Sequence, residues 1–260
     1  MRKILAFAWL PFLALALAAQ TQPPAAGQQG NLAQIFVARP KPGSDAQYNE
    51  GRKRHMAWHR SQNDAWSVFV WEITTGDNTG AFVTGTFGHR WADYDAREKL
   101  ITADEADVAK NIAPYRQSTA VSYWVFRPDI SRSTDPEGST PYVQITHFFV
   151  NPDGLPTFID SVKKINAGIQ KTNYPAAPGR WYQLVNGGQG PHFVLAVGRK
   201  NLGEMQGPEK TLDQMMAEAY GEQEGRAILD TIRKTYKSTY TELLRLRSDL
   251  SYTPGGATAK

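Results

Sequence analysis

The sequence of 260 residues contains no cysteine. This absence excludes disulfides, thiolate metal ligands and a lipid-modified cysteine after a signal peptide. The chain also lacks a P-loop, a dinucleotide fingerprint and a G-x-S-x-G nucleophile motif. The glycine-rich stretch Asn186–Phe193 joins two β-rich runs, so it predicts a hairpin and not a phosphate cradle. Nucleotide-binding and serine-hydrolase functions are therefore not indicated.

Neither sign of charge is in large excess. The chain has 29 Lys and Arg against 25 Asp and Glu. Two of the basic residues, Arg2 and Lys3, lie in the segment expected to be removed, which leaves 27 against 25. No basic stripe with interleaved aromatic side chains is present, as nucleic-acid binding would require. We expect no nucleic-acid partner.

Only one long hydrophobic run occurs, at the N-terminus. It extends from Ile4 to Ala19, is interrupted by Pro11, and is shorter than the ~20 residues that span a bilayer. A basic start, an apolar middle and terminal small residues predict a secretory signal cleaved after Ala18 or Ala19; an uncleaved anchor is the alternative. We therefore expect a periplasmic or secreted protein with no membrane contact after cleavage.

One segment of the sequence recurs later in the chain. Ser118–Ser131 reads STAVSYWVFRPDIS and Ser238–Ser251 reads STYTELLRLRSDLS. Five of these fourteen positions are identical, where average composition gives roughly one. The paired Arg and Asp in both copies predict a structural brace after the last strand of each copy. Other pairs recur at offsets near 115 residues, as a duplicated domain would show.

The duplication predicts a domain plan. Its segments are a signal peptide (1–19), a flexible linker (20–30), a first repeat (31–131), a second linker (132–142), a second repeat (143–252) and a flexible tail (253–260). Each repeat reads strand, helix, strand, strand, helix, strand, the order of a ferredoxin-like unit. The predicted class is α+β, with two antiparallel sheets that face each other as a barrel.

Three local expectations can be compared directly with the structure. The second helix of the first repeat is expected at Ala103–Tyr115, with Thr102 and Glu105 as a capping box. Its counterpart is expected as one helix from about Leu212 to Lys237. The segment Glu242–Arg247 has helical propensity, but its β-prone partner in the first repeat predicts a strand.

In element order and duplication, the chain resembles the dimeric α+β barrel superfamily in a fused, single-chain form. That superfamily includes proteins similar to antibiotic-biosynthesis monooxygenases, EthD-like proteins, and the haem-binding chlorite dismutases and dye-decolorising peroxidases. The resemblance implies cofactor-independent oxygenation or a related conversion of a small molecule. It does not choose among the functions that the fold hosts.

The first helix of repeat one carries polar side chains where repeat two has a core face. The aligned pairs are Tyr48 with Phe158, Arg52 with Val162, His55 with Ile165 and His59 with Ile169. The steps of four, three and four residues follow one helical stripe. Buried polar groups need partners, so the stripe predicts a cavity, a ligand or a paired network. A one-residue shift would instead pair Arg52 with Lys163 and remove this contrast.

His55 and His59 also have the i,i+4 spacing at which two imidazoles can reach one metal ion. Nothing nearby in the sequence completes the set. The candidates for a third ligand are His89, His147, His192 and Glu72. A structural histidine pair is the alternative.

We predict a small-molecule pocket in the first repeat. Its expected catalytic residues are Arg52, His55 and His59. The expected substrate-binding residues are Tyr48, Trp71, Glu72 and His147. His55 or His59 would transfer a proton, and Arg52 would hold an anionic or enolic oxygen. No cofactor is expected, with haem or a divalent metal as alternatives. A non-catalytic ligand-binding or interaction module, monomeric or homodimeric, is the competing hypothesis.

Overall fold

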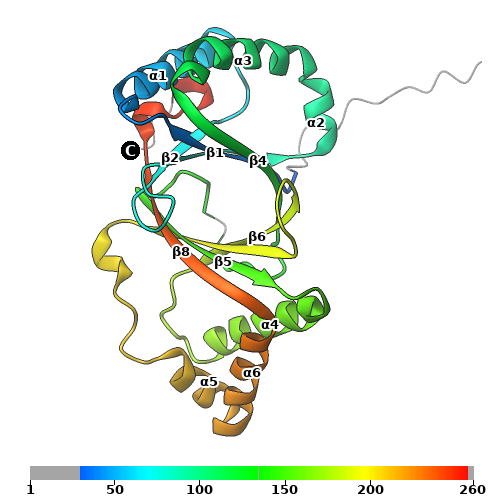
Figure 1. The fold of residues 1–260 in the computed structure, drawn as a ribbon. Helices are drawn as coiled ribbons and strands as arrows, with labels where there is room; N and C mark the ends of the chain where they lie inside the picture. The colour runs from blue at the N-terminus through cyan, green and yellow to red at the C-terminus, as the bar shows by residue number, and fades with distance from the viewer. Residues whose placement is uncertain (1–29, 134, 257–260) are drawn as a thin grey trace, which may run out of the picture.

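Eight antiparallel strands form one closed barrel in the computed structural model, which describes residues 30–133 and 135–256 (Figure 1). The strands are β1 (Leu32–Pro40), β2 (Phe69–Ile73), β3 (Phe82–His89), β4 (Arg116–Phe126), β5 (Tyr142–Val150), β6 (Gly179–Asn186), β7 (His192–Arg199) and β8 (Tyr236–Leu246). Their order is β1-β3-β2-β8-β5-β7-β6-β4. The predicted fold of two ferredoxin-like units forming an α+β barrel is confirmed.

Helices cover the two opposite ends of the molecule (Figure 1). The longer ones are α1 (Asp45–Ser61), α3 (Glu98–Asn111), α4 (Leu155–Lys171) and α6 (Glu222–Lys234), with shorter α2 (Trp91–Ala96) and α5 (Leu212–Tyr220) beside them. Within the described residues, none of the helices has the length and hydrophobicity needed to cross a membrane. The expected signal peptide lies outside the described residues.

Two of the local expectations about helices are wrong. Helix α3 begins at Glu98, one turn earlier than expected, because good helix formers precede Thr102. Thr102 is therefore inside the helix and donates its hydroxyl to the Glu98 carbonyl at 3.1 Å. The single helix expected over Leu212–Lys237 is divided into α5 and α6 by Gly221, whose φ of 85° ends the first of them.

The strand expected at Glu242–Arg247 is confirmed, since β8 contains all but its last residue. Strands β4 and β8 each have 11 residues. Helices α1 and α4 each have 17 residues. Tyr48 and Phe158 are thus the fourth residue of their helices, and both are fully buried. This supports the alignment that pairs Arg52 with Val162 and not with Lys163.

The duplicated segments fasten each repeat to the other. Arg127 binds Asp129 through two hydrogen bonds of 2.8 Å, and Arg247 binds Asp249 through two of 2.9 Å, so the predicted braces are confirmed. The Ser131 hydroxyl accepts a bond from the Trp181 backbone in repeat two. The last residue of the second copy, Ser251, accepts one from the backbone of Val70 in repeat one.

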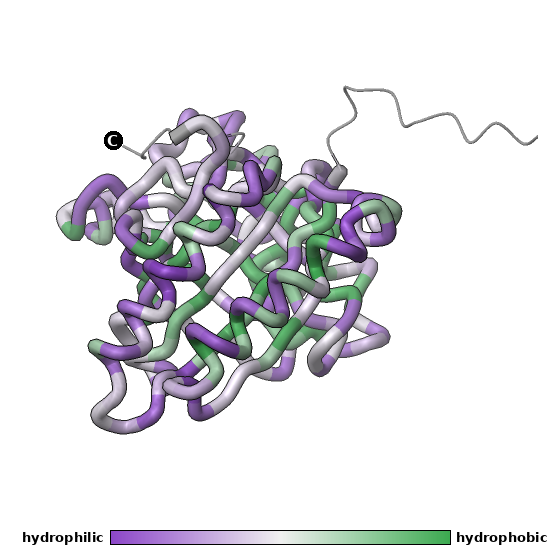
Figure 2. The backbone as a smooth tube through the Cα atoms, turned by 90° about the horizontal axis from the view of Figure 1, so that it is seen from above, coloured by the Kyte–Doolittle hydropathy of each residue, from purple (hydrophilic) through white to green (hydrophobic). Residues whose placement is uncertain are grey.

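Each brace also inserts an apolar side chain into the core of the other repeat. Ile130 is buried with Phe158, Val162 and other residues of the second repeat. Leu250 is buried with Tyr48 and other residues of the first. The identical Arg, Asp and Ser of the two copies therefore hold a segment through which the repeats exchange core residues. Hydrophobic residues gather toward the middle of the molecule and hydrophilic residues toward its outside (Figure 2).

Candidate metal centre and adjoining cavity

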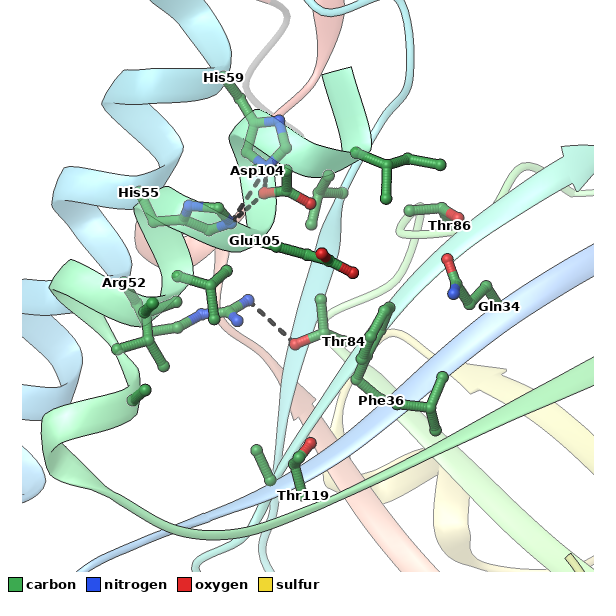
Figure 3. Close-up of a pocket in the computed structure, with 18 of the residues that line it drawn as sticks. Gln34, Phe36, Arg52, His55, His59, Thr84, Thr86, Asp104, Glu105 and Thr119 are labelled. Carbon is green, nitrogen blue, oxygen red and sulfur yellow. Dashed lines mark hydrogen bonds and ion pairs between the residues drawn. The ribbon is translucent and has the colours of Figure 1, made fainter. Parts of the chain in front are cut away.

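A cavity of about 600 Å³ lies between α1, α3 and the sheet of the first repeat (Figure 3). Much of its wall is apolar, and includes Phe36, Val108, Ile112 and Val121. Arg52, His55 and His59 line it from α1, together with Tyr48. Four of the seven predicted site residues therefore lie at one cavity, on the stripe that the sequence indicates.

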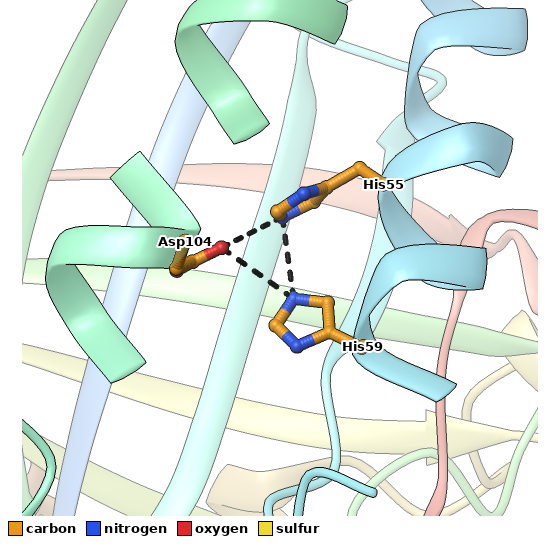
Figure 4. Close-up of side chains that lie close together, drawn as sticks. All are labelled: His55, His59 and Asp104. Atoms are coloured by element: carbon orange, nitrogen blue, oxygen red, sulfur yellow. Dashed lines mark hydrogen bonds and ion pairs between the residues drawn. The ribbon is translucent and has the colours of Figure 1, made fainter. Parts of the chain in front are cut away.

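His55, His59 and Asp104 form the most compact polar group at this cavity (Figure 4). The Nε2 atoms of the two histidines are 3.2 Å apart. Asp104 Oδ1, from α3, lies 3.1 Å from His55 Nε2 and 3.7 Å from His59 Nε2. All three atoms face one point between the two helices. None of the four third-ligand candidates named from the sequence belongs to this group.

The other ring nitrogen of each histidine faces a carboxylate. His55 Nδ1 lies 2.8 Å from Asp107 Oδ1, and His59 Nδ1 lies 2.8 Å from Asp64 Oδ2. Because an ionised carboxylate only accepts hydrogen bonds, these contacts favour the tautomer with the proton on Nδ1. In a neutral imidazole, Nε2 then presents a lone pair.

Asp64 is held firmly as an anion. Its side chain is fully buried, and Arg97 donates to both of its oxygens at 2.6 and 2.8 Å. Burial alone would raise the pKa of Asp64, but hydrogen bonds from Arg97, His59 and the Trp66 backbone outweigh it and hold the pKa well below its usual range. The carboxylate therefore stays charged and orients His59 across the whole physiological pH range.

With both histidines in these tautomers, three acceptor atoms are directed at each other. The buried Asp104 Oδ1 makes no hydrogen bond within residues 30–133 and 135–256. With metal–ligand bonds of about 2.1 Å, neighbouring ligand atoms in an octahedral or tetrahedral shell lie about 3.0–3.4 Å apart. The observed separations of 3.1, 3.2 and 3.7 Å are close to that range. The group can hold a divalent cation, or a shared proton in its place.

Haem does not fit these histidines. An axial ligand needs an open, flat space in front of its free nitrogen. Here the Nε2 atoms of His55 and His59 block each other at 3.2 Å, and Asp104 closes the remaining side. His147 lines a cavity of about 180 Å³ inside the barrel, which is too small for a porphyrin. His89 is stacked on Trp66, with ring centroids 3.5 Å apart.

Three predicted substrate-binding residues lie away from the main cavity. Trp71 and His147 line the smaller cavity inside the barrel. Glu72 lines neither cavity, because its carboxylate binds Arg245 at 2.8 Å and Arg247 at 3.2 Å. Glu72, which was predicted to bind substrate, belongs instead to an ion-pair network where β2 meets β8.

The three carboxylates of the site, Asp64, Asp104 and Asp107, were not predicted from the sequence. Asp104 and Asp107 are three residues apart on one helix, a spacing that places both on one face. That face was the available signal, because both residues lie in the helix expected at Ala103–Tyr115, but nothing in the sequence placed it against His55 and His59. Asp64 lies in the loop after α1, where nothing in the sequence distinguishes it from a solvated acid.

Because of a buried histidine inside the barrel, we expect the protein to lose stability in acid. His192 is buried, its Nε2 lies 3.0 Å from His147 Nδ1, and burial together with His147 lowers its pKa from 6.5 to about 4. Between pH 4 and pH 6.5, the unfolded chain therefore binds a proton at His192 that the folded chain does not bind. This contribution is complete above pH 6.5 and falls by about 2–3 kcal/mol on acidification to pH 4.5.

Urea denaturation at pH 7 and pH 4.5 measures this effect. We expect His192→Asn to lose about 2 kcal/mol less than the wild type between the two pH values. An unchanged pH dependence in this variant would contradict the assignment.

Comparison with known proteins defines the fold and not the family. No protein-family model matches the chain, and no curated protein matches it in sequence. A proposed monooxygenase from Lactobacillus acidophilus is similar in structure, with 11% identity over 87% of this chain and 98% of that one and a TM-score of 0.52. An anthrone oxidase-like protein gives 11% identity, 86% and 93% coverage, and a TM-score of 0.54.

A mutant chlorite dismutase from Candidatus Nitrospira defluvii is also similar, with 9% identity over 85% of this chain and 95% of that one and a TM-score of 0.52. The chain therefore has the α+β barrel fold of this superfamily, with both ferredoxin-like units in a single polypeptide. At these identities no residue role can be transferred to this chain, so the function must be argued from the site.

Proposed function

We propose that the protein is a divalent-metal-dependent enzyme that converts a small organic molecule in the cavity of the first repeat. The observation that carries this proposal is the convergence of His55 Nε2, His59 Nε2 and Asp104 Oδ1 on one point. Metal-binding histidines commonly donate a hydrogen bond from their other ring nitrogen to a carboxylate, and both histidines have a carboxylate 2.8 Å from that nitrogen here.

Two imidazoles and one carboxylate suit Fe²⁺, Co²⁺ or Zn²⁺. Three protein ligands leave positions for water or substrate, and these would open on the cavity. A set of two histidines and one carboxylate with open positions is characteristic of non-haem iron oxygenases. We therefore favour oxidation by dioxygen, which also agrees with the names of the monooxygenase and anthrone oxidase-like proteins of similar fold.

The resemblance taken alone suggested oxygenation without a cofactor. The three converging acceptors support a metal instead, because neutral imidazoles and a carboxylate repel one another without a cation between them. A protonated histidine would be the cofactor-free equivalent, in which the pair transfers a proton to or from the substrate.

Cobalt binding tests the proposal. The protein is dialysed against a chelator and titrated with Co²⁺ under nitrogen, with visible absorption and calorimetry as readouts. We expect one ion per chain, with Asp104→Asn reducing the affinity at least 100-fold. The matched control is Glu98→Gln, an exposed acid of the same helix, which should bind Co²⁺ as the wild type does. Absence of stoichiometric binding of Co²⁺, Fe²⁺ and Zn²⁺ would refute the metal centre.

A further inference from the structure

Arg52 is a second unusual group at the same cavity. Only 6% of the residue is exposed, and its Nη2 donates to the Thr84 hydroxyl at 2.9 Å (Figure 3). Its Nε is buried and makes no hydrogen bond to the described part of the chain. No carboxylate of the described residues lies within ion-pairing distance of it. The fold thus holds a buried guanidinium without a counter-ion.

A buried cation of this kind is costly unless something pairs with it. An arginine side chain does not lose its proton in a protein, so the cost of burying the charge remains. The second repeat shows that the position itself does not need a charge, because the equivalent Val162 is buried in an ordinary core. The same contrast holds for Tyr48, whose buried hydroxyl makes no hydrogen bond to the described residues, while its equivalent is Phe158.

The charged groups around Arg52 favour the binding of an anion. Asp104 is the carboxylate that acts on Arg52 electrostatically, and its charge would be more than balanced by a divalent ion. Arg116 adds a second positive charge to the cavity lining. The opposing charge is Glu105, which is exposed at the rim on α3 and points toward the cavity (Figure 3). With a metal bound, the inner end of the cavity is electropositive.

We propose that the cavity binds an apolar carboxylic acid, whose carboxylate pairs with Arg52 and accepts a hydrogen bond from Tyr48. The hydrocarbon part of the ligand would lie along the apolar wall formed by Phe36, Val108 and Val121. The identification of this acid as the substrate rests on the proposed function, but its pairing with Arg52 does not require the metal. Each proposal can therefore be disproved without the other.

The test compares two probes of the same shape, 2-naphthoate and its uncharged analogue 2-naphthamide. Binding is measured by calorimetry and tryptophan fluorescence, in metal-free and in Zn²⁺-loaded wild-type protein. We expect naphthoate to bind at least tenfold more tightly than naphthamide in both forms. Equal affinities, or no binding of either probe, would overturn the carboxylate site, whatever the outcome of the Co²⁺ titration.

Two variants assign the discrimination to the named groups. Arg52→Met should weaken naphthoate binding at least tenfold and change naphthamide binding less than twofold. Tyr48→Phe removes only the hydroxyl, as repeat two does at Phe158, and should weaken naphthoate binding about threefold. The control is Arg60→Met, an exposed arginine of the same helix. Unchanged naphthoate affinity in folded Tyr48→Phe and Arg52→Met proteins would reject the assignment, and Tyr48→Phe keeps the test valid if Arg52→Met does not fold.

Discussion

Replacing His59 by alanine is expected to lower the affinity for Co²⁺ at least 1000-fold. The change removes one of three ligand atoms, and the two that remain, from His55 and Asp104, come from different helices and bind less cooperatively. A thousandfold loss corresponds to about 4 kcal/mol of binding free energy. His55→Ala should have a similar effect. Calorimetric titration of the metal-free proteins measures both.

A structural role for His59 would give a different result. Asp64 keeps its two bonds from Arg97 in the variant, so the loss of His59 should cost the metal-free fold only about 1–3 kcal/mol. His147→Ala serves as a control, since this histidine lies in the barrel interior and should leave Co²⁺ affinity unchanged. A large loss of stability with Co²⁺ affinity within tenfold of the wild type would identify the pair as structural.

Gly51→Ala should both destabilise the protein and weaken metal binding. A Cβ atom at this buried position of α1 would lie 1.9 Å from the backbone oxygen of Asn111 at the end of α3. Because this neighbour is backbone, the two helices would have to move apart. We expect a loss of about 2–3 kcal/mol in the free energy of unfolding, as for other overpacked sites.

The same displacement would separate His55 and His59 on α1 from Asp104 on α3. We expect the affinity for Co²⁺ to fall at least tenfold. The control is Gly168→Ala on α4, where a Cβ would lie 3.2 Å from both Met216 Sδ and Tyr220 Cε2, which are side-chain and not backbone atoms. That variant should stay within about 1 kcal/mol of the wild type, because alanine also favours the helix. Equal stabilities of the two variants would show that the close approach of α1 and α3 is not required.

The sequence predicted the fold because it contains the same information twice. The recurrence of Arg, Asp and Ser after β4 and β8 reflects one structural device used in both repeats. The duplication also corrected a local preference, since the Leu-rich and Arg-rich segment at Glu242–Leu246 would be helical by propensity alone. The polar stripe on α1 was found by the same comparison, through the contrast with α4.

Only the part of the site on α1 could be predicted, because it alone was found by comparing the two repeats. Asp104 meets the histidines through the packing of α3 on α1, across 45 residues of chain, and no spacing rule gives that contact. Glu72 was misplaced because the sequence does not show that Arg245 of β8 and Arg247, directly after β8, would lie beside it. The beginning of α3 was missed because the helix formers before Thr102 continue the helix past the expected cap, and the break was missed because Gly221 was not recognised as a helix end.

The reciprocal exchange of core residues has a consequence for biosynthesis. Tyr252 follows the second brace, its hydroxyl donates to the Asp64 carbonyl at 2.6 Å, and its ring stacks on His59. Leu250 completes the core beneath Tyr48. A ribosome that has finished the whole first repeat has therefore made every residue that lines the cavity, but not the residues that pack behind Tyr48 and His59. These two side chains acquire their final surroundings only when Leu250 and Tyr252 emerge, so premature termination in the second repeat would release a first repeat whose site lacks this support.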